Sequence, residues 1–481
     1  MKPVSEVLGP IAYKIFRPLK SLPFLHKALR FGYYESMALL RFLEHRLRSL
    51  KNRESLGLEH FVQTVSRFEI PENDYADAPS LIAFLQKSGI TFVESSHTIY
   101  LPPQDGLAKV FGGTSSNYPP DAGFKILKNF EPPETANYLN QNFIHAKREL
   151  EITGALSNQV EAANTLFALG LGPELYDLIE LKNGSVSMSC FVCRHVAGEA
   201  PDEKEHAGFI EQINSHVEAG RFSLASIAGV RDDDFLDAPG CNGNLLKEEK
   251  SGQLHYVDFQ QFLPTIPKVL DHILDGARTD LHFGDTRLVT GNKKFLYQAI
   301  PSTNHVAKRD TNARWPKILS LLASQKISLE NRVVLDVCCN SGLVLALALH
   351  EGARWGLGWD LPKVIQHSRK ILPALGASRT TLFPAELSPG YALSRDVPDW
   401  LSSKTEGAVL FYLAAVEHVG LIEDLGKTPW KTLIFEGHQG DSEAQLQEQF
   451  QKIEQLWGAT LKKATTMNDD SGSRFLGVFT R

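Results

Sequence analysis

The sequence predicts an α/β C-terminal domain, with a mainly parallel sheet and helices on both faces, preceded by an α+β domain and an amphipathic helical N-terminus. Beyond about Trp315, apolar runs of strand length alternate with amphipathic helical segments, which is typical of a parallel sheet covered on both faces. From about residue 95 to 275, strands and helices lack that regular alternation. The predicted boundaries are 1–54 for a basic helical segment, 55–94 for a connector, 95–280 for the α+β domain and 281–481 for the α/β domain.

The composition is that of a globular protein. A chain of 481 residues is too long for a single core and suits two or three domains. No apolar run approaches the ~20 residues that span a bilayer, and the N-terminus lacks the pattern of a signal peptide. The cysteines show no disulfide spacing, and Cys190 and Cys193 lie in a strand-like run that points them to opposite faces. We therefore expect a cytoplasmic protein in which these cysteines bind no zinc.

The N-terminal segment differs in charge from the rest of the chain. Residues 1–53 carry a formal charge of +8, and the remainder carries −14. Ile11, Ile15 and Leu19 recur at helical spacing among basic residues, a pattern typical of helices that lie in the headgroup region of an anionic membrane. Two helices packed on the body of the protein, or on a second subunit, would give the same pattern. Peripheral contact with the inner face of the membrane is therefore one of two expectations.

Apolar periodicity predicts the individual elements. In the α/β domain, strands are expected at Arg332–Val337, Trp355–Trp359, Thr380–Phe383, Ala408–Leu413, Thr432–Glu436 and Phe475–Phe479. In the α+β domain, strands are expected at Thr98–Leu101, Leu107–Phe111, Gly123–Leu127, Leu175–Leu181, Ser187–His195, Asn244–Lys247 and Leu254–Phe259. Helices are expected at Ala78–Ser88, Pro133–Leu156, Val160–Leu169 and Glu203–Ala219.

The segment Arg332–Gly342 is the most informative about function. It consists of an apolar strand that contains Asp336 near its end, a turn of small residues and the start of a helix. In an open α/β sheet, ligands bind at the carboxyl ends of the strands, and small residues there let the backbone approach the ligand closely. The next strand ends in Asp360, 24 residues after Asp336, and its carboxylate can accept two hydrogen bonds from a ribose diol.

These residues resemble the first two motifs of class I S-adenosylmethionine-dependent methyltransferases. The resemblance implies a Rossmann-like fold in which Asp336 lies near the methionine end of the cofactor and Gly342 packs beneath it. Asp360 would hold the ribose hydroxyls. After the third strand, Glu386 stands where the family usually keeps an acid near the adenine amino group.

The cofactor turn departs from the family pattern. Cys338 and Asn340 replace two glycines; asparagine can adopt left-handed backbone angles, whereas Cys338 narrows the loop slightly. A dinucleotide pyrophosphate requires those glycines, so a nicotinamide-binding domain fits poorly, and a cofactor-free relic is the other alternative. Upstream, Lys308–Trp315 resembles the lead-in of transfer-RNA wobble-uridine and polysaccharide methyltransferases. This resemblance implies that Arg314 caps the cofactor cleft, although a helix packed across the sheet edge explains the segment equally well.

Three side chains are candidates for chemistry at the methyl acceptor. His418 follows the fourth strand, Glu436 ends the fifth, and His438 comes two residues later. All three are expected to project near the place where the methyl group leaves the sulfur. An oxygen or nitrogen acceptor that carries a proton needs a base near neutral pH, which histidine supplies. We expect His418 as the first candidate and His438 as the second, while either histidine can instead be structural.

The α+β domain resembles a protein-kinase-like fold. Lys125 matches the family's third-strand lysine, and Glu149 on the following helix matches its ion-pair partner. Asn244 and Asp258, fourteen positions apart, match the asparagine and aspartate that bind magnesium. The resemblance therefore implies ATP and magnesium as ligands of this domain, with Lys125 on the phosphates and Asn244 and Asp258 on the metal.

Two positions depart from the kinase pattern. Pro239 stands where the family places the aspartate that orients the acceptor hydroxyl, and the nearest match to a glycine-rich loop is the Gly-Gly-Thr after Phe111. With both domains, the chain resembles the bifunctional kinase–methyltransferases that modify the ends of cell-surface polysaccharides, with the domains in reversed order. They imply a lipid-linked or cell-surface saccharide as the acceptor.

Two further functions fit the same sequence. The first is an RNA or small-molecule methyltransferase whose middle domain only binds substrate, although the acidic body of the chain argues against an extended nucleic-acid interface. The second is a non-enzymatic scaffold in which both folds have decayed. Neither the acceptor nor the oligomeric state follows from the sequence.

Overall fold

The computed structural model describes residues 66–69, 77–95, 98–128, 156–183, 186–224, 244–257, 262–276, 296–298, 300, 303, 307–309, 311–402, 404–469 and 472–481. The chain divides into two compact units, and each contains its own sheet. The C-terminal unit includes Asp271–Arg369 and Thr381–Arg481, and the middle unit includes Val62–Leu270 and Lys370–Thr380.

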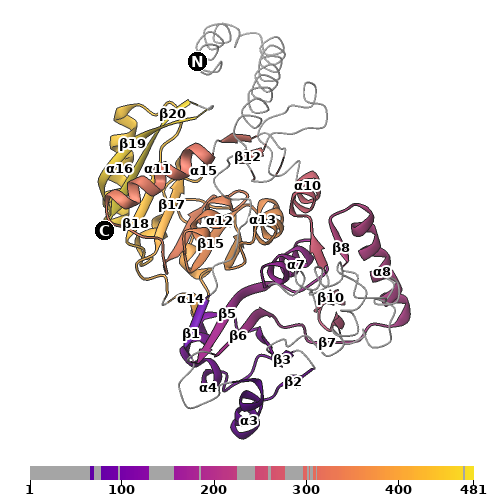
Figure 1. The fold of residues 1–481 in the computed structure, drawn as a ribbon. Helices are drawn as coiled ribbons and strands as arrows, with labels where there is room; N and C mark the ends of the chain where they lie inside the picture. The colour runs from indigo at the N-terminus through magenta and orange to yellow at the C-terminus, as the bar shows by residue number, and fades with distance from the viewer. Residues whose placement is uncertain are drawn as a thin grey trace. The chain divides into compact units, whose positions relative to one another are not determined.

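The C-terminal unit contains a seven-stranded sheet in the order β16-β15-β14-β17-β18-β20-β19 (Figure 1). Its strands are β14 (Val333–Val337), β15 (Trp355–Asp360), β16 (Thr380–Pro384), β17 (Val409–Leu413), β18 (Thr432–Glu436), β19 (Thr460–Asp469) and β20 (Gly472–Thr480). β14 pairs in parallel with β15 and β17, and β17 pairs in parallel with β18. β20 runs antiparallel to both β18 and β19. The predicted α/β domain with a mainly parallel sheet is therefore confirmed.

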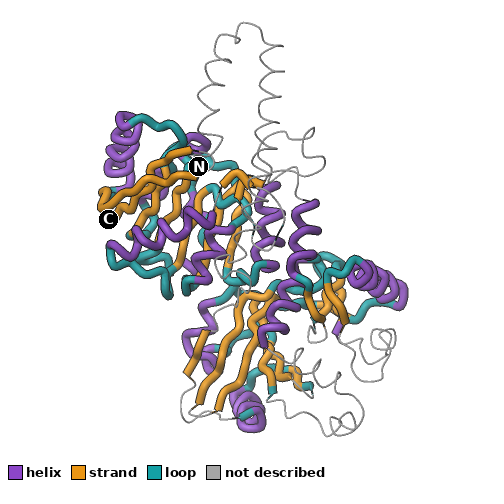
Figure 2. Tube along the Cα trace, turned by 45° about the horizontal axis from the view of Figure 1, so that its top comes forward, coloured by secondary structure: helices purple, strands orange, loops and turns teal. Residues whose placement is uncertain are grey.

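Helices lie on both sides of these strands (Figure 2). The longer ones are α11 (Thr311–Ser324), α12 (Leu343–His350), α13 (Pro362–Ala374) and α16 (Glu443–Trp457). Shorter pieces are η4 (Leu393–Arg395), α14 (Asp399–Ser402), α15 (Val416–Val419) and η5 (Glu423–Gly426). Two short strands that the sequence did not predict, β12 (Leu296–Gln298) and β13 (Ala307–Arg309), pair in parallel with each other.

Helix α12 packs closely on the sheet and so fixes the turn that precedes it. Every residue from Leu343 to Leu349 is buried, which is why this helix is apolar all round. Gly358 on β15 makes the close approach possible, because a Cβ there would lie 2.9 Å from side-chain atoms of Cys339, Leu345 and Leu382. The strand, the turn and the helix are thus held together without a gap.

The middle unit has a six-stranded sheet in the order β1-β5-β6-β4-β3-β2. Its strands are β1 (Ser66–Glu69), β2 (Val93–Glu94), β3 (Thr98–Leu101), β4 (Ala122–Leu127), β5 (Leu175–Asn183) and β6 (Val186–Arg194). A second sheet is formed by β7 (Gly198–Glu199), β9 (Leu245–Glu248) and β10 (Leu254–Tyr256), and β8 (Phe222–Leu224) pairs with β11 (Phe262–Pro264). The helices are α3 (Ala78–Ser88), α7 (Leu156–Ala168), α8 (Glu203–Glu218) and α10 (Ile266–Gly276). The predicted α+β composition of this region agrees with these elements.

One predicted strand of the middle unit is wrong. The run Leu107–Phe111 forms the short helix α4 (Ala108–Phe111), which continues into the 3-10 helix η2 (Gly112–Asn117). Leu107, Val110 and Phe111 are the buried residues, and their spacing is that of a helix face rather than of a strand. The nearest match to a glycine-rich loop is therefore part of a 3-10 helix.

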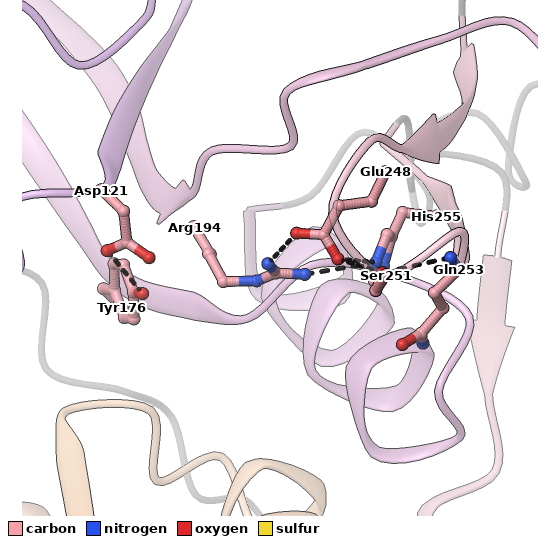
Figure 3. Close-up of polar contacts among 7 residues, drawn as sticks. All are labelled: Asp121, Tyr176, Arg194, Glu248, Ser251, Gln253 and His255. Carbon is pink, nitrogen blue, oxygen red and sulfur yellow. Dashed lines mark hydrogen bonds and ion pairs between the residues drawn. The ribbon is translucent and has the colours of Figure 1, made fainter.

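Arg194, at the end of β6, ties the six-stranded sheet to the hairpin of β9 and β10 (Figure 3). Its guanidinium pairs with the Glu248 carboxylate, and Nη2 lies 3.2 Å from Nε2 of His255. Ser251 Oγ donates to Glu248 at 2.5 Å. The hydrogen bonds from Ser251 and Arg194 lower the pKa of Glu248 to about 2. Arg194, Glu248 and His255 are buried or half-buried, so their contacts fix the hairpin against the larger sheet.

Several predictions concern residues that the structure does not describe. The basic segment 1–54, Glu149 and Asp258 lie outside the described residues, as does the predicted helix from 133 apart from Leu156. Among the described helices, none combines the length and the apolar character needed to cross a membrane.

Candidate functional site

The strand order of the C-terminal sheet reverses direction at β14. From β14 the chain continues to β15 and β16 on one side, and then returns to β17 and β18 on the other. Ligands of open α/β sheets bind at such a reversal, outside the carboxyl ends of the strands. Here the carboxyl ends of β14 and β17 lie side by side, because Val337 pairs with Tyr412.

The backbone at this place adopts left-handed angles. After β14, Cys338 has φ 60°, Asn340 has φ 50° and Gly342 has φ 78°. After β17, Ala414 has φ 54° and donates its N–H to the Glu436 carbonyl oxygen at 2.9 Å. Left-handed non-glycine residues are costly and cluster at ligand sites, so this turn is a candidate binding loop. The sequence prediction that Asn340 tolerates such angles agrees with the structure.

Asp360 links the second strand to the turn. Its Oδ2 accepts the N–H of Asn340 at 2.8 Å, and its Oδ1 accepts the N–H of Leu361 at 2.7 Å. A carboxylate offers about four acceptor positions, so two remain for hydroxyl groups of a ligand. Burial raises the pKa of Asp360, and the two N–H donors and the nearby His418 oppose that shift. The described contacts thus aim this carboxylate at the binding loop.

Asp336 is a buried acid whose hydrogen bonding is incomplete. Its side chain is 2% exposed, and Oδ2 has no hydrogen-bond partner among the described atoms. Burial raises its pKa to about 8, Asp360 adds to the shift, and Arg314 opposes it. A buried polar atom without a partner is costly, so its presence at the switch point favours a ligand that supplies a donor.

Neighbouring side chains hold the turn in place. Ser341 Oγ bonds Gln298 Oε1 at 2.8 Å, and Ser368 Oγ donates to the Asn340 carbonyl oxygen at 2.5 Å. Glu386 follows β16 at the same edge of the sheet and is exposed. The structure therefore brings Asp336, Asp360 and the turn together, with Glu386 further along the edge.

His418 and His438 lie close together at the carboxyl ends of β17 and β18. Their ring centroids are 5.9 Å apart, with the rings edge to face. His438 Nε2 lies 2.6 Å from Oε2 of Glu417, a residue that the sequence reasoning did not select. Burial lowers the pKa of His438, and Glu417 raises it. Only its place next to His418 in the sequence could have pointed to Glu417.

The sequence analysis expected Glu436 to project near the methyl acceptor, and in the structure its side chain is enclosed in a network of buried arginines. Its side chain is fully buried, pairs with Arg309, and lies 3.2 Å from Nη1 of Arg314. Arg474 on β20 adds a contact at 3.8 Å. These contacts with buried guanidinium groups join Glu436 of β18 to α11 and β13. The reading of α11 as a helix packed across the sheet edge agrees with this arrangement.

Two residues predicted to bind a nucleotide, Lys125 and Asn244, both contact the backbone of Val257. Lys125 Nζ donates to the Val257 carbonyl oxygen at 3.3 Å, and the Val257 N–H donates to the Asn244 carbonyl oxygen at 2.7 Å. Two of the four predicted nucleotide ligands therefore contact the residue that precedes Asp258. Among the described side chains there is no group of three or more His, Cys, Asp or Glu that could hold a metal ion.

No protein-family model matches the chain, and no curated protein matches it. Solved structures similar to it include the magnesium protoporphyrin IX methyltransferase of Synechocystis PCC 6803 with bound SAH, at 13% identity and a TM-score of 0.26. That match covers 34% of this chain and 81% of the other. An S-adenosylmethionine-dependent methyltransferase from Mesorhizobium loti matches at 13% identity and a TM-score of 0.27, over 35% of this chain and 98% of the other. Each match spans about a third of this chain.

Proposed function

We propose that the C-terminal unit transfers a methyl group from S-adenosylmethionine to an oxygen or nitrogen acceptor. The observation that carries this proposal is the pair of acids beside the left-handed turn, Asp336 buried and Asp360 half-buried. Among the described residues Asp336 offers a carboxyl oxygen without a hydrogen-bond partner, and Asp360 keeps acceptor positions next to the Asn340 N–H. A ligand with an ammonium group and a ribose diol supplies donors to both.

The residues have distinct tasks in this function. Asp360 accepts the ribose hydroxyls, Asp336 faces the methionine end, and Glu386 stands beside the adenine amino group. The cofactor, when bound, supplies the methyl group, and its sulfur keeps the electron pair of the broken bond. The protein's contribution is placement of the acceptor in line with that bond, together with a base that takes the acceptor's proton.

The acceptor that we propose is a hydroxyl group of a lipid-linked or cell-surface saccharide. The support for this choice is the sequence resemblance of both units and the charge of +8 on residues 1–53, which suits an anionic membrane surface. An RNA or small-molecule acceptor is the alternative, and salt-sensitive retention of RNA by the full chain would favour it.

Calorimetric titration with S-adenosylmethionine tests the proposed cofactor. We expect micromolar binding by the full chain and a loss of roughly tenfold or more in Asp360→Asn, because the amide offers fewer acceptor positions to the ribose. Asp399→Asn is the matched control, since Asp399 is exposed on α14, and it should bind as the wild type does. Absence of binding by folded wild-type protein would refute the proposal.

We further propose that the middle unit binds a nucleotide phosphate through Lys125. The contact that favours this second function is the hydrogen bond from Lys125 Nζ to Val257, next to Asp258 in the sequence. Magnesium-ATP should raise the melting temperature of the protein, and Lys125→Met should remove that rise. Lys109→Met is the matched control, because Lys109 is exposed on α4.

A further inference from the structure

We infer that Glu417 is a positioning residue that orients His438 as the base for the methyl acceptor. The inference rests on the proposed methyltransferase function and adds a residue to it. It also exchanges the order of the two histidines, since the sequence favoured His418 over His438. The argument starts from how the chain brings Glu417 and His438 to one edge of the sheet.

Two adjacent parallel strands place Glu417 and His438 next to each other. β17 ends at Leu413, which pairs in register with Glu436 at the end of β18. Glu417 follows in the first turn of α15, and His438 follows two residues after β18. Their side chains meet with Oε2 and Nε2 2.6 Å apart. Glu417 therefore reaches His438 across the carboxyl end of the sheet, at the edge that holds the binding loop.

The contact decides which nitrogen of His438 is basic. With Nε2 against the Glu417 carboxylate, the neutral ring carries its proton on Nε2 and its lone pair on Nδ1. The backbone N–H of His438 donates to Asp441 Oδ2 at 2.6 Å, which fixes the chain that carries the ring. A ring held at both its nitrogen and its backbone has a defined Nδ1 direction.

His438 is also close to the binding loop through His418. The His418 ring lies 5.9 Å from the His438 ring, and its charge also acts on the Asp360 carboxylate, whose pKa it lowers. His418 itself is exposed, whereas the side chain of His438 is 30% exposed and contacts a carboxylate. The His438 ring is partly enclosed and oriented by Glu417, so it is a better base than the exposed His418 ring.

Burial is the main cause of the lowered pKa of His438, which keeps its ring neutral at pH 7. Burial lowers its pKa, and Arg474 on β20 and His418 on α15 lower it further. Glu417 on α15 and Asp441 after β18 raise it. Because the net shift is downward from 6.5, the ring is available to accept a proton near neutral pH.

The proton balance of the step is simple. The acceptor's oxygen or nitrogen forms a bond to the methyl carbon, and its own proton passes to Nδ1 of His438. The ring becomes an imidazolium, and the sulfur that loses the methyl group becomes neutral. Glu417 then faces a positive ring and stabilises it, and the proton leaves to water after the product departs.

The test is an NMR titration of the His438 ring in the full chain, assigned with a His438→Gln variant. The two ligands used are S-adenosylmethionine and S-adenosylhomocysteine, which differ by the methyl group and the positive charge on sulfur. If His438 faces the methyl group, its pKa should be lower by about half a unit or more in the first complex. Equal values in two well-formed complexes would overturn the inference and leave the proposed function intact, whereas absence of binding contradicts the proposed function.

Glu417→Gln tests the positioning role directly. Loss of the carboxylate should lower the pKa of His438 by about one unit and mix the two ring tautomers, which the nitrogen chemical shifts report. Affinity for S-adenosylhomocysteine should stay within about twofold, since Glu417 is not a cofactor ligand in this arrangement. Glu448→Gln, which removes an exposed carboxylate paired with Lys452, is the matched control and should leave His438 unchanged. An unaltered tautomer in Glu417→Gln would overturn the positioning role.

Discussion

Asp336 makes the stability of the protein depend on pH in an unusual direction. Burial raises its pKa from 3.8 to about 8, so the folded chain holds a proton that the unfolded chain has already lost across that range. The contribution of Asp336 to the free energy of unfolding is therefore fully present at low pH and is lost as the pH rises through about 8. The change is at most about 1.4 kcal/mol per pH unit for a single titrating group.

Asp336→Asn removes that titration. From about pH 5 to pH 8, the free energy of unfolding of the wild type should fall relative to that of the variant. Urea denaturation at a series of pH values measures the difference. Parallel pH curves for the two proteins would show that the folded carboxyl titrates normally, and the argument for an incompletely bonded buried acid would then fail.

Individual side chains also show where sequence reasoning reaches its limit. Asp336 and Asp360 were predicted at one edge because strand ends follow from apolar runs and flanking turns. Glu436 was expected near the methyl acceptor. Its ion pairs with Arg309 and Arg314 were not predictable, because both arginines lie more than a hundred residues away in the sequence. Glu417 was missed for the same reason, because only the parallel pairing of β17 and β18 brings it to His438. Contacts between distant segments are not encoded in local periodicity.

At the scale of elements, the buried strands and the edge strand β16 were predictable, and the other edge strand, β19, was not. β14 is buried throughout and reads as a continuous apolar run. β19 lies at the end of the sheet, and its residues Lys462 and Lys463 are exposed. Lysines on an edge strand discourage pairing with other chains, but they also remove the apolar signal by which a strand is recognised. The helix α4 was mistaken because a run of five residues holds too little periodicity.

Gly358 controls how closely α12 approaches β15, and Gly358→Ala tests this packing. The added methyl group would lie 2.9 Å from Cys339, Leu345 and Leu382, so the helix or the side chains must shift. We expect a loss of about 1–3 kcal/mol in the free energy of unfolding, as for other overpacked cores. Chemical denaturation measures it.

A second glycine provides the control for this substitution. Gly390→Ala adds the same methyl group where nothing lies within 4 Å, and it should change the free energy of unfolding by less than about 0.5 kcal/mol. Similar effects of the two substitutions would contradict the packing argument. If Gly358→Ala also weakens S-adenosylmethionine binding, the link between α12 packing and the geometry of the Cys338–Gly342 turn is supported.

At the scale of the whole molecule, the two units each bury a core of their own. The middle unit centres on residues such as Phe191, Phe209 and Phe262, and the C-terminal unit on the buried strands around β14. Units with separate cores, each binding the ligand proposed for it, should unfold in separate calorimetric transitions. S-adenosylmethionine should then raise the temperature of one transition, and magnesium-ATP should raise the other.

The size of each shift follows from mass action. A ligand at a hundred times its dissociation constant stabilises the unit that binds it by about 2.7 kcal/mol, which moves the transition of a unit of this size by several degrees. Asp360→Asn should cancel only the shift caused by S-adenosylmethionine, and Lys125→Met only the shift caused by magnesium-ATP. A single transition that both ligands raise would mean that the units unfold as one, and that each substitution acts on the stability of the whole chain.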